Sequence, residues 1–105
     1  MQNDLALQIE DIVRRIVDVA QPEKIILFGS AARGEERPDS DVDILVVKKG
    51  AQRRRLAGEI YQRLMGVGRA IDVVVVTPED IERYGSSPAL VICPALREGK
   101  VVYAV

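Results

Sequence analysis

The sequence predicts an α/β protein whose helices and strands alternate along one domain, residues 1–105. Three observations support this prediction. Short apolar runs rich in β-branched residues recur along the chain, which is typical of strands. The segments between them carry apolar residues three or four positions apart, as helices do. Glycine or proline stands near most of the junctions. The predicted order is α-β-α-β-α-β-α-β.

The first element is a predicted helix, capped by Asn3 or Asp4 and ended before Pro22. Its apolar stripe consists of Ile9, Ile12, Val13, Ile16, Val17 and Ala20. Lys24–Phe28 is a short apolar strand that Gly29 breaks. A short helix is expected from Ala31 to about Glu36, with Ser30 near its N-cap position, and Pro38–Ser40 is expected to form a turn.

The middle of the chain predicts a strand over Val42–Val47, apolar enough to be covered on both faces. A helix is expected over residues 51–65, before Gly66 and Gly68. Its predicted buried stripe is Leu56, Ala57, Ile60, Tyr61 and Leu64. Arg53, Arg54 and Arg55, together with Lys48 and Lys49, form a basic cluster that is expected to be a solvated helix face.

The last third predicts a strand over Ala70–Thr77 and a helical turn from Pro78 to Tyr84, with Thr77 as cap and Asp80 near position N3. Another short helix is expected from Ser87–Pro88 onward, and a final strand over Lys100–Val105. A terminal strand of this composition at a sheet edge favours pairing with another chain. A homodimer or a docked partner is therefore expected there.

Composition restricts the chemistry. The chain has no histidine, which excludes histidine bases and histidine metal ligands, so any metal site must use oxygen ligands suited to Mg²⁺, Mn²⁺ or Ca²⁺. A net charge of −1 argues against a non-specific nucleic-acid binder. A single cysteine, Cys93, is compatible with a reducing cytoplasm. No apolar run predicts a signal peptide or membrane span.

The most informative stretch is FGSAARGEERPDSDVDILVV, residues 28–47. Gly29 allows a phosphate to approach the backbone closely, and Ser30 offers a hydroxyl at a helix start. Asp41 and Asp43 are separated by one residue, so they share a strand face. Asp43 precedes an uninterrupted apolar run, where a carboxylate is unfavourable unless a cation compensates it.

Asp72 repeats this anomaly inside the predicted strand Ala70–Thr77. Alternation predicts that it faces away from Ile71, Val73 and Val75. If the two Asp-bearing strands are neighbours, three carboxylates converge, and one or two divalent cations would balance their charge. The alternative is that Asp72 simply lies at the exposed edge of a sheet.

The pattern G-S, about ten residues, D-x-D and a later strand Asp resembles the signature of the nucleotidyltransferase superfamily that includes DNA polymerase beta. The form GS-x-AR-G…SD-x-D resembles its minimal nucleotidyltransferases (MNT). The resemblance implies a mixed sheet flanked by helices, with ATP and Mg²⁺ bound at the Gly-Ser turn. It assigns nucleotide binding to Gly29 and Ser30, and metal binding and catalysis to Asp41, Asp43 and Asp72. Arg33, one helical turn past Ser30, is expected to contact a phosphate.

Minimal nucleotidyltransferases are often paired with a HEPN-domain toxin. The implied function is Mg²⁺-dependent transfer of AMP from ATP to a hydroxyl, such as a tyrosine of that toxin, by which the chain acts as an antitoxin. Two alternatives remain open: a non-catalytic module that neutralises a toxin by occlusion, and nucleotidyl transfer to a small molecule or an RNA.

Overall fold

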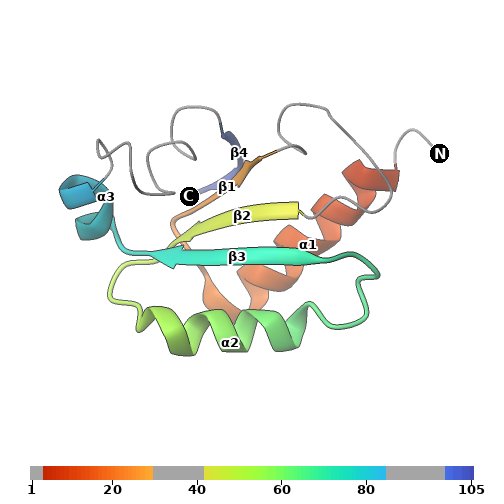
Figure 1. The fold of residues 1–105 in the computed structure, drawn as a ribbon, viewed down its shortest axis with the longest axis horizontal. Helices are drawn as coiled ribbons and strands as arrows, with labels where there is room; N and C mark the ends of the chain where they lie inside the picture. The colour runs from red at the N-terminus through yellow and green to blue at the C-terminus, as the bar shows by residue number, and fades with distance from the viewer. Residues whose placement is uncertain (1–3, 30–41, 85–98) are drawn as a thin grey trace.

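The computed structural model describes residues 4–29, 42–84 and 99–105. Within them a four-stranded sheet has the order β3-β2-β1-β4. The strands are β1 (Lys24–Phe28), β2 (Val42–Val47), β3 (Ile71–Val76) and β4 (Lys100–Ala104), and the helices are α1 (Asp4–Ala20), α2 (Arg53–Arg63) and α3 (Pro78–Tyr84), as Figure 1 shows.

The sheet is mixed, as the sequence resemblance implied. Strand β1 runs antiparallel to both β2 and β4, whereas β2 and β3 run parallel to each other. The parallel pair is joined through α2, which is the usual way to connect parallel strands. Because β2 and β3 are in register from Val42 and Ile71 onward, both begin at the same end of the sheet.

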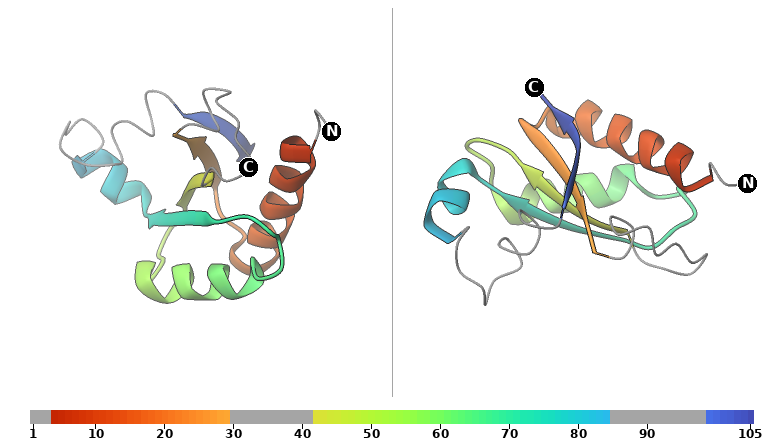
Figure 2. Two further views of the ribbon diagram at one scale, coloured as in Figure 1. Left: turned by 45° about the vertical axis from the view of Figure 1, so that its right-hand side comes forward. Right: turned by 90° about the horizontal axis from the view of Figure 1, so that it is seen from above.

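Helices α1 and α2 lie on one face of the sheet, as the two views in Figure 2 show. The main apolar core lies between them and the strands, and alternate strand residues supply it. Its fully or nearly fully buried members include Ile12 and Ile16 of α1, Ile60 of α2, and Ile25, Val42, Ile44 and Val46 of the strands. The period-2 pattern of the strands and the helical stripe of α1 therefore meet as the sequence predicted.

The opposite face carries a smaller apolar cluster. Ile26, Leu45, Val47 and Val76 are its buried members, with Phe28, Val74 and Ile81 packed against them. Because Val42–Val47 contributes to both clusters, the prediction that this strand is covered on both faces is confirmed. Ile81 belongs to α3, so α3 covers part of this second face.

The start of α3 has the predicted capping arrangement. The Asp80 backbone N–H donates to Thr77 Oγ1 at 3.1 Å, and the Thr77 backbone N–H donates to Asp80 Oδ2 at 2.9 Å. This reciprocal pair satisfies two backbone groups at the helix start. The hydrogen bond from the Thr77 N–H, helped by the Arg53 charge, holds the pKa of the Asp80 carboxyl below its ordinary value, although burial acts in the opposite direction.

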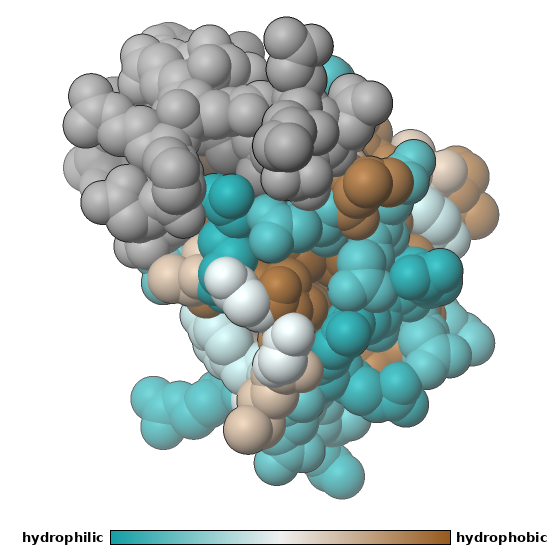
Figure 3. All heavy atoms as spheres, turned by 90° about the vertical axis from the view of Figure 1, so that its right-hand side faces the viewer, coloured by the Kyte–Doolittle hydropathy of each residue, from teal (hydrophilic) through white to brown (hydrophobic). Residues whose placement is uncertain are grey.

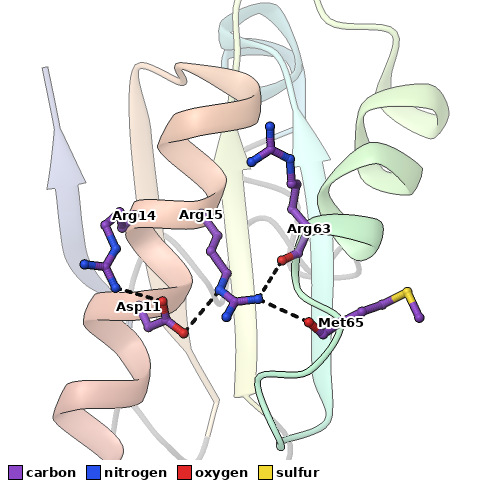
Figure 4. A network of polar contacts seen from close by, with 5 residues as sticks. All are labelled: Asp11, Arg14, Arg15, Arg63 and Met65. Carbon is purple, nitrogen blue, oxygen red and sulfur yellow. Dashed lines mark hydrogen bonds and ion pairs between the residues drawn. The ribbon is translucent and has the colours of Figure 1, made fainter.

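The two helices are tied together by Arg15 of α1 (Figure 4). Its guanidinium donates to the carbonyl oxygens of Arg63, at 2.9 Å, and Met65, at 3.1 Å, where α2 ends. It also pairs with Asp11, whose pKa is lowered by hydrogen bonds from Arg14 and then from Arg15. A cationic side chain at the C-terminal end of a helix satisfies carbonyls that lack helical partners.

Some predicted limits need correction. The helix expected over residues 51–65 spans only Arg53–Arg63. It begins late because Gln52 has extended backbone, and it ends early because the chain turns after Leu64 toward Gly66 and Gly68, both at positive φ. The strand expected over Ala70–Thr77 is shorter by one residue at each end. The strand expected over Lys100–Val105 ends one residue earlier, at Ala104. These are ordinary differences at the ends of elements.

Tyr61 is the substantive error in the predicted core. The residue is 42% exposed, because its phenol lies along the outer edge of β3 instead of pointing under the sheet. Arg53, Arg54 and Arg55 of the basic cluster are exposed on α2 as predicted, whereas Lys48 precedes the helix, is half-buried and donates to the Gln21 carbonyl oxygen at 3.1 Å. The helices expected after Ser30 and from Ser87, and Cys93, lie outside the described residues.

Candidate active site

The candidate site lies where β1 ends and where β2 and β3 begin. Register places Phe28 opposite Asp43, and Asp43 opposite Asp72. The end of one strand and the beginnings of two others thus bring together Gly29, Asp43 and Asp72. These residues come from segments that are far apart in the sequence.

Gly29 and Asp43 are in direct contact. Gly29 has a φ of +76°, a left-handed conformation that side-chain-bearing residues rarely adopt. A Cβ built on Gly29 would overlap the Asp43 carboxylate oxygen Oδ2 and lie 3.2 Å from Cγ. Glycine is therefore required here for two separate reasons, and its missing side chain leaves room for the carboxylate beside the turn.

Asp43 and Asp72 occupy directly paired positions on parallel strands, so both side chains point to the same sheet face. Asp72 faces away from the buried Val73 and Val75, which confirms the predicted alternation. The face they share is the one opposite α1 and α2, because Leu45 and Val76, in phase with them, belong to the second apolar cluster.

The two carboxylates differ in exposure. Asp43 is half-buried on a central strand, whereas Asp72 is exposed on β3, the outer strand of the described sheet. Asp72 is therefore exposed at the edge of the described sheet, as the alternative interpretation expected. It nevertheless also lies beside Asp43. Like charges at paired positions destabilise a sheet, and oxygen-binding cations relieve that repulsion.

Three predicted site residues, Ser30, Arg33 and Asp41, lie outside the described residues. Sequence places Ser30 directly after Gly29 and Asp41 two residues before Asp43. In the described ranges, acidic residues meet here as a pair, and no group of three or more potential metal ligands occurs. The predicted triad of carboxylates is thus represented by two of its members.

Tyr61 is a residue at this site that the sequence reasoning did not anticipate. Its hydroxyl oxygen accepts a hydrogen bond of 2.8 Å from the backbone N–H of Val73, the residue after Asp72. An aromatic residue on the apolar stripe of a helix is typical of a core position. Only the placement of α2 beside the edge of β3 reveals a polar contact.

The surface at the end of the sheet where β2 and β3 begin is mixed in polarity. Seen from the side at which β2 and β3 begin, small apolar patches lie between hydrophilic side chains (Figure 3). Basic side chains gather instead near the far end of β2, where Lys48, Lys49 and Arg55 line a cavity of about 320 Å³.

None of the helices in the described part of the chain combines the length and apolar character that a membrane crossing needs.

Known proteins resemble this chain in sequence and in fold. Residues 7–94 match the family model described as "Nucleotidyltransferase domain". A relative from Methanocaldococcus jannaschii, named "Putative protein adenylyltransferase", is 35% identical over 85 residues. That match covers 75% of this chain and 56% of the relative, so this chain spans little more than half of the relative's length.

Two solved structures share the fold. One, titled "Crystal structure of the toxin-antitoxin with AMP-PNP", gives a TM-score of 0.69 at 23% identity over 91% of this chain and 73% of its own. The other is described as a "putative nucleotidyltransferase from Sulfolobus solfataricus". It gives a TM-score of 0.54 at 22% identity over 92% of this chain and 86% of its own. With a family model matched over most of its length, the chain belongs to the nucleotidyltransferase domain family.

Proposed function

We propose that this chain transfers AMP from ATP to a hydroxyl group on a partner protein and releases pyrophosphate. The observation that carries the proposal is the contact between Gly29 and Asp43, with Asp72 at the neighbouring register position. This contact places a pair of carboxylates next to a turn that a phosphate can approach closely. Family membership supports nucleotidyl transfer, and the name of the M. jannaschii relative supports a protein acceptor.

In this reaction the acceptor oxygen attacks the α-phosphorus of ATP. A new P–O bond forms to the acceptor, the bond from the α-phosphorus to the bridging oxygen breaks, and pyrophosphate departs. The Asp72 carboxylate takes part in removing the acceptor proton. The Gly29 backbone, Ser30 and Arg33 hold the phosphates. Catalysis is then mostly a matter of position and electrostatics.

The residues present fit Mg²⁺. Asp43 and Asp72 offer carboxylate oxygens at adjacent positions on one face, and Asp41 adds a third from the same short segment as Asp43. Mg²⁺ prefers oxygen ligands and is usually held by one or two carboxylates together with substrate phosphates. When bound, it supplies positive charge that neutralises the triphosphate and the leaving group.

The proposed acceptor is a tyrosine of a HEPN-domain toxin, so that the chain acts as a cytoplasmic antitoxin of the minimal nucleotidyltransferase (MNT) type. The structural likeness to a toxin–antitoxin complex, whose title includes an ATP analogue, motivates this choice. The domain assignment, residues 1–105 as a single nucleotidyltransferase domain, is part of the same proposal.

The test uses the full chain, Mg²⁺ and the protein encoded by the adjacent gene, with ATP labelled at either the α- or the γ-phosphate. We expect label from the α-phosphate alone to appear on the partner, with a mass gain of one AMP on a tyrosine. Asp72→Asn should slow transfer by about 10²- to 10⁴-fold while ATP still binds. Full activity of this variant, or an equal loss of ATP binding, contradicts the assigned role.

Glu59→Gln is the matched control, because Glu59 is an exposed acid on α2 that forms an ion pair with Arg55 of the same helix. It should leave transfer unchanged. The double variant Asp41→Asn/Asp43→Asn separates enzyme from binding module. If it neutralises the toxin as well as the native chain does, the antitoxin acts by occlusion and not by transfer. Label on an RNA or a small molecule would instead identify another acceptor.

A further inference from the structure

Tyr61 contacts strand β3 at the residue that follows Asp72. The hydroxyl oxygen accepts a bond of 2.8 Å from Val73 N–H. Since Val73 directly follows Asp72, this N–H belongs to the peptide group that joins the two residues. The contact therefore fixes the backbone immediately beside the carboxylate.

Strand β3 is paired on its inner side only. Strand β2 holds it from Ile71 to Val76, whereas in the described residues no strand lies beyond its outer side. Edge strands leave backbone groups without ladder partners, and strand ends open first. Asp72 is the second residue of β3, so it lies where an outer anchor matters most.

The hydrogen bond from Val73 to Tyr61 links the edge of β3 to a helix that is itself held in the core. Tyr61 belongs to the last turn of α2, whose neighbour Ile60 is fully buried in the main core. The rigid helix thus holds the phenol, and the phenol holds the edge of β3. Tyr61 is exposed, so it contributes less to apolar burial than Ile60 and Leu64 on the same helical stripe do.

We propose that Tyr61 is a positioning residue that holds Asp72 beside Asp43 through the Val73 amide, and so sets how well the carboxylate pair binds a divalent cation. The part of this inference that concerns transfer rests on the proposed function. The part that concerns cation binding does not, because it needs neither ATP nor an acceptor.

The test compares Tyr61→Phe with Tyr103→Phe. Each variant loses one phenol hydroxyl, but Tyr103 lies on β4, two strands away from β2, at the other edge of the sheet. Amide hydrogen exchange reports the Val73 N–H. Titration with Mn²⁺ alone, followed by paramagnetic broadening of the Asp43 and Asp72 resonances, reports the carboxylate pair. The values of kcat and KM for ATP report transfer.

For Tyr61→Phe we expect faster exchange at Val73 and a higher half-saturating Mn²⁺ concentration. We also expect kcat per folded molecule to fall roughly three- to tenfold, which corresponds to one lost hydrogen bond, with an unchanged KM for ATP. Tyr103→Phe should leave all of these values unchanged. A merely structural role for Tyr61 would lower the melting temperature yet leave the Mn²⁺ midpoint of the folded molecules as it was.

An unchanged Mn²⁺ midpoint in Tyr61→Phe overturns the inference, as does native protein that binds no Mn²⁺ at the pair. The proposed function fails separately. Native protein that binds Mn²⁺ but transfers no AMP refutes the function, while a shifted Mn²⁺ midpoint in Tyr61→Phe still supports the positioning role.

Discussion

The two faces of the sheet are built from the same strands but differ in which residues they carry. On the face toward α1 and α2, alternate residues of β2 are all apolar and buried: Val42, Ile44 and Val46. On the other face the series begins with Asp43 and becomes apolar only from Leu45 onward. The comparison shows that one face supplies a continuous core, while the other combines a smaller cluster with a polar end suited to chemistry.

The largest expected effect is on the helix-covered face. Ile44 is 1% exposed, so Ile44→Ala should lower the free energy of unfolding by about 2–5 kcal/mol through lost burial and a cavity. Denaturant titration measures the change, and Leu7→Ala, at an exposed position, is the control. Mn²⁺ binding by the molecules that remain folded should be unchanged. A weakened site would mean that the two faces are not independent.

The next effect is at the junction between the turn and the carboxylates. Gly29→Ala should lower the free energy of unfolding by about 2–3 kcal/mol, because positive φ and overlap with Asp43 act together. Gly66→Ala is the matched control, since Gly66 has a φ of +89° but nothing lies within 4 Å of its built Cβ. Equal losses in the two variants would show that the contact with Asp43 adds nothing.

A smaller effect concerns α3, which covers part of the second face. Asp80→Asn should lower the free energy of unfolding by about 1 kcal/mol at neutral pH, because it weakens the cap. The folded-state pKa of Asp80 lies below the unfolded value, so its contribution is complete above the unfolded pKa and disappears as pH falls through the folded one.

Thermal or denaturant unfolding of Asp80→Asn and the native chain should therefore converge in acid, below about pH 4. Glu79→Gln, in the same first turn but exposed, is the control and should show a smaller dependence on pH. A difference between Asp80→Asn and the native chain that stays constant down to acid pH would contradict the assigned role of the ionised carboxylate.

The smallest expected effect has the opposite sign. Asp72→Asn removes one of two like charges at paired positions, so it should raise the free energy of unfolding by about 0.5 kcal/mol in the absence of divalent cations. Lys100→Gln, at the far edge of the sheet, is the comparison for a general charge effect. If Asp72→Asn instead lowers the free energy of unfolding, the Asp72 carboxylate stabilises the folded protein and the prediction is wrong.

Much of the fold follows from local patterns in the sequence. The bounds of Lys24–Phe28 and Val42–Val47 were predicted without error, because apolar β-branched runs end sharply at polar or glycine residues. The cap of α3 by Thr77 and Asp80 was equally predictable, since capping depends on a few neighbouring residues. The anomaly of Asp43 and Asp72 was also visible, as a charge inside an apolar strand.

What the sequence could not provide was the relation between distant segments. Tyr61 was assigned to the core because helical periodicity gives the face of a side chain but not the distance at which its hydroxyl meets another element. The roles of all the site residues remain predictions: Gly29, Ser30, Arg33, Asp41, Asp43 and Asp72.

For the described residues, the sequence by itself determined the strands, the helices and the positions at which charge replaces apolar character, because these depend on neighbours along the chain. Only the tertiary structure decided that Asp43 and Asp72 share a register position, that Gly29 makes room for one of them, and that Tyr61 holds the strand of the other. Strand order and register arise from the packing of whole elements, which no short window of residues contains.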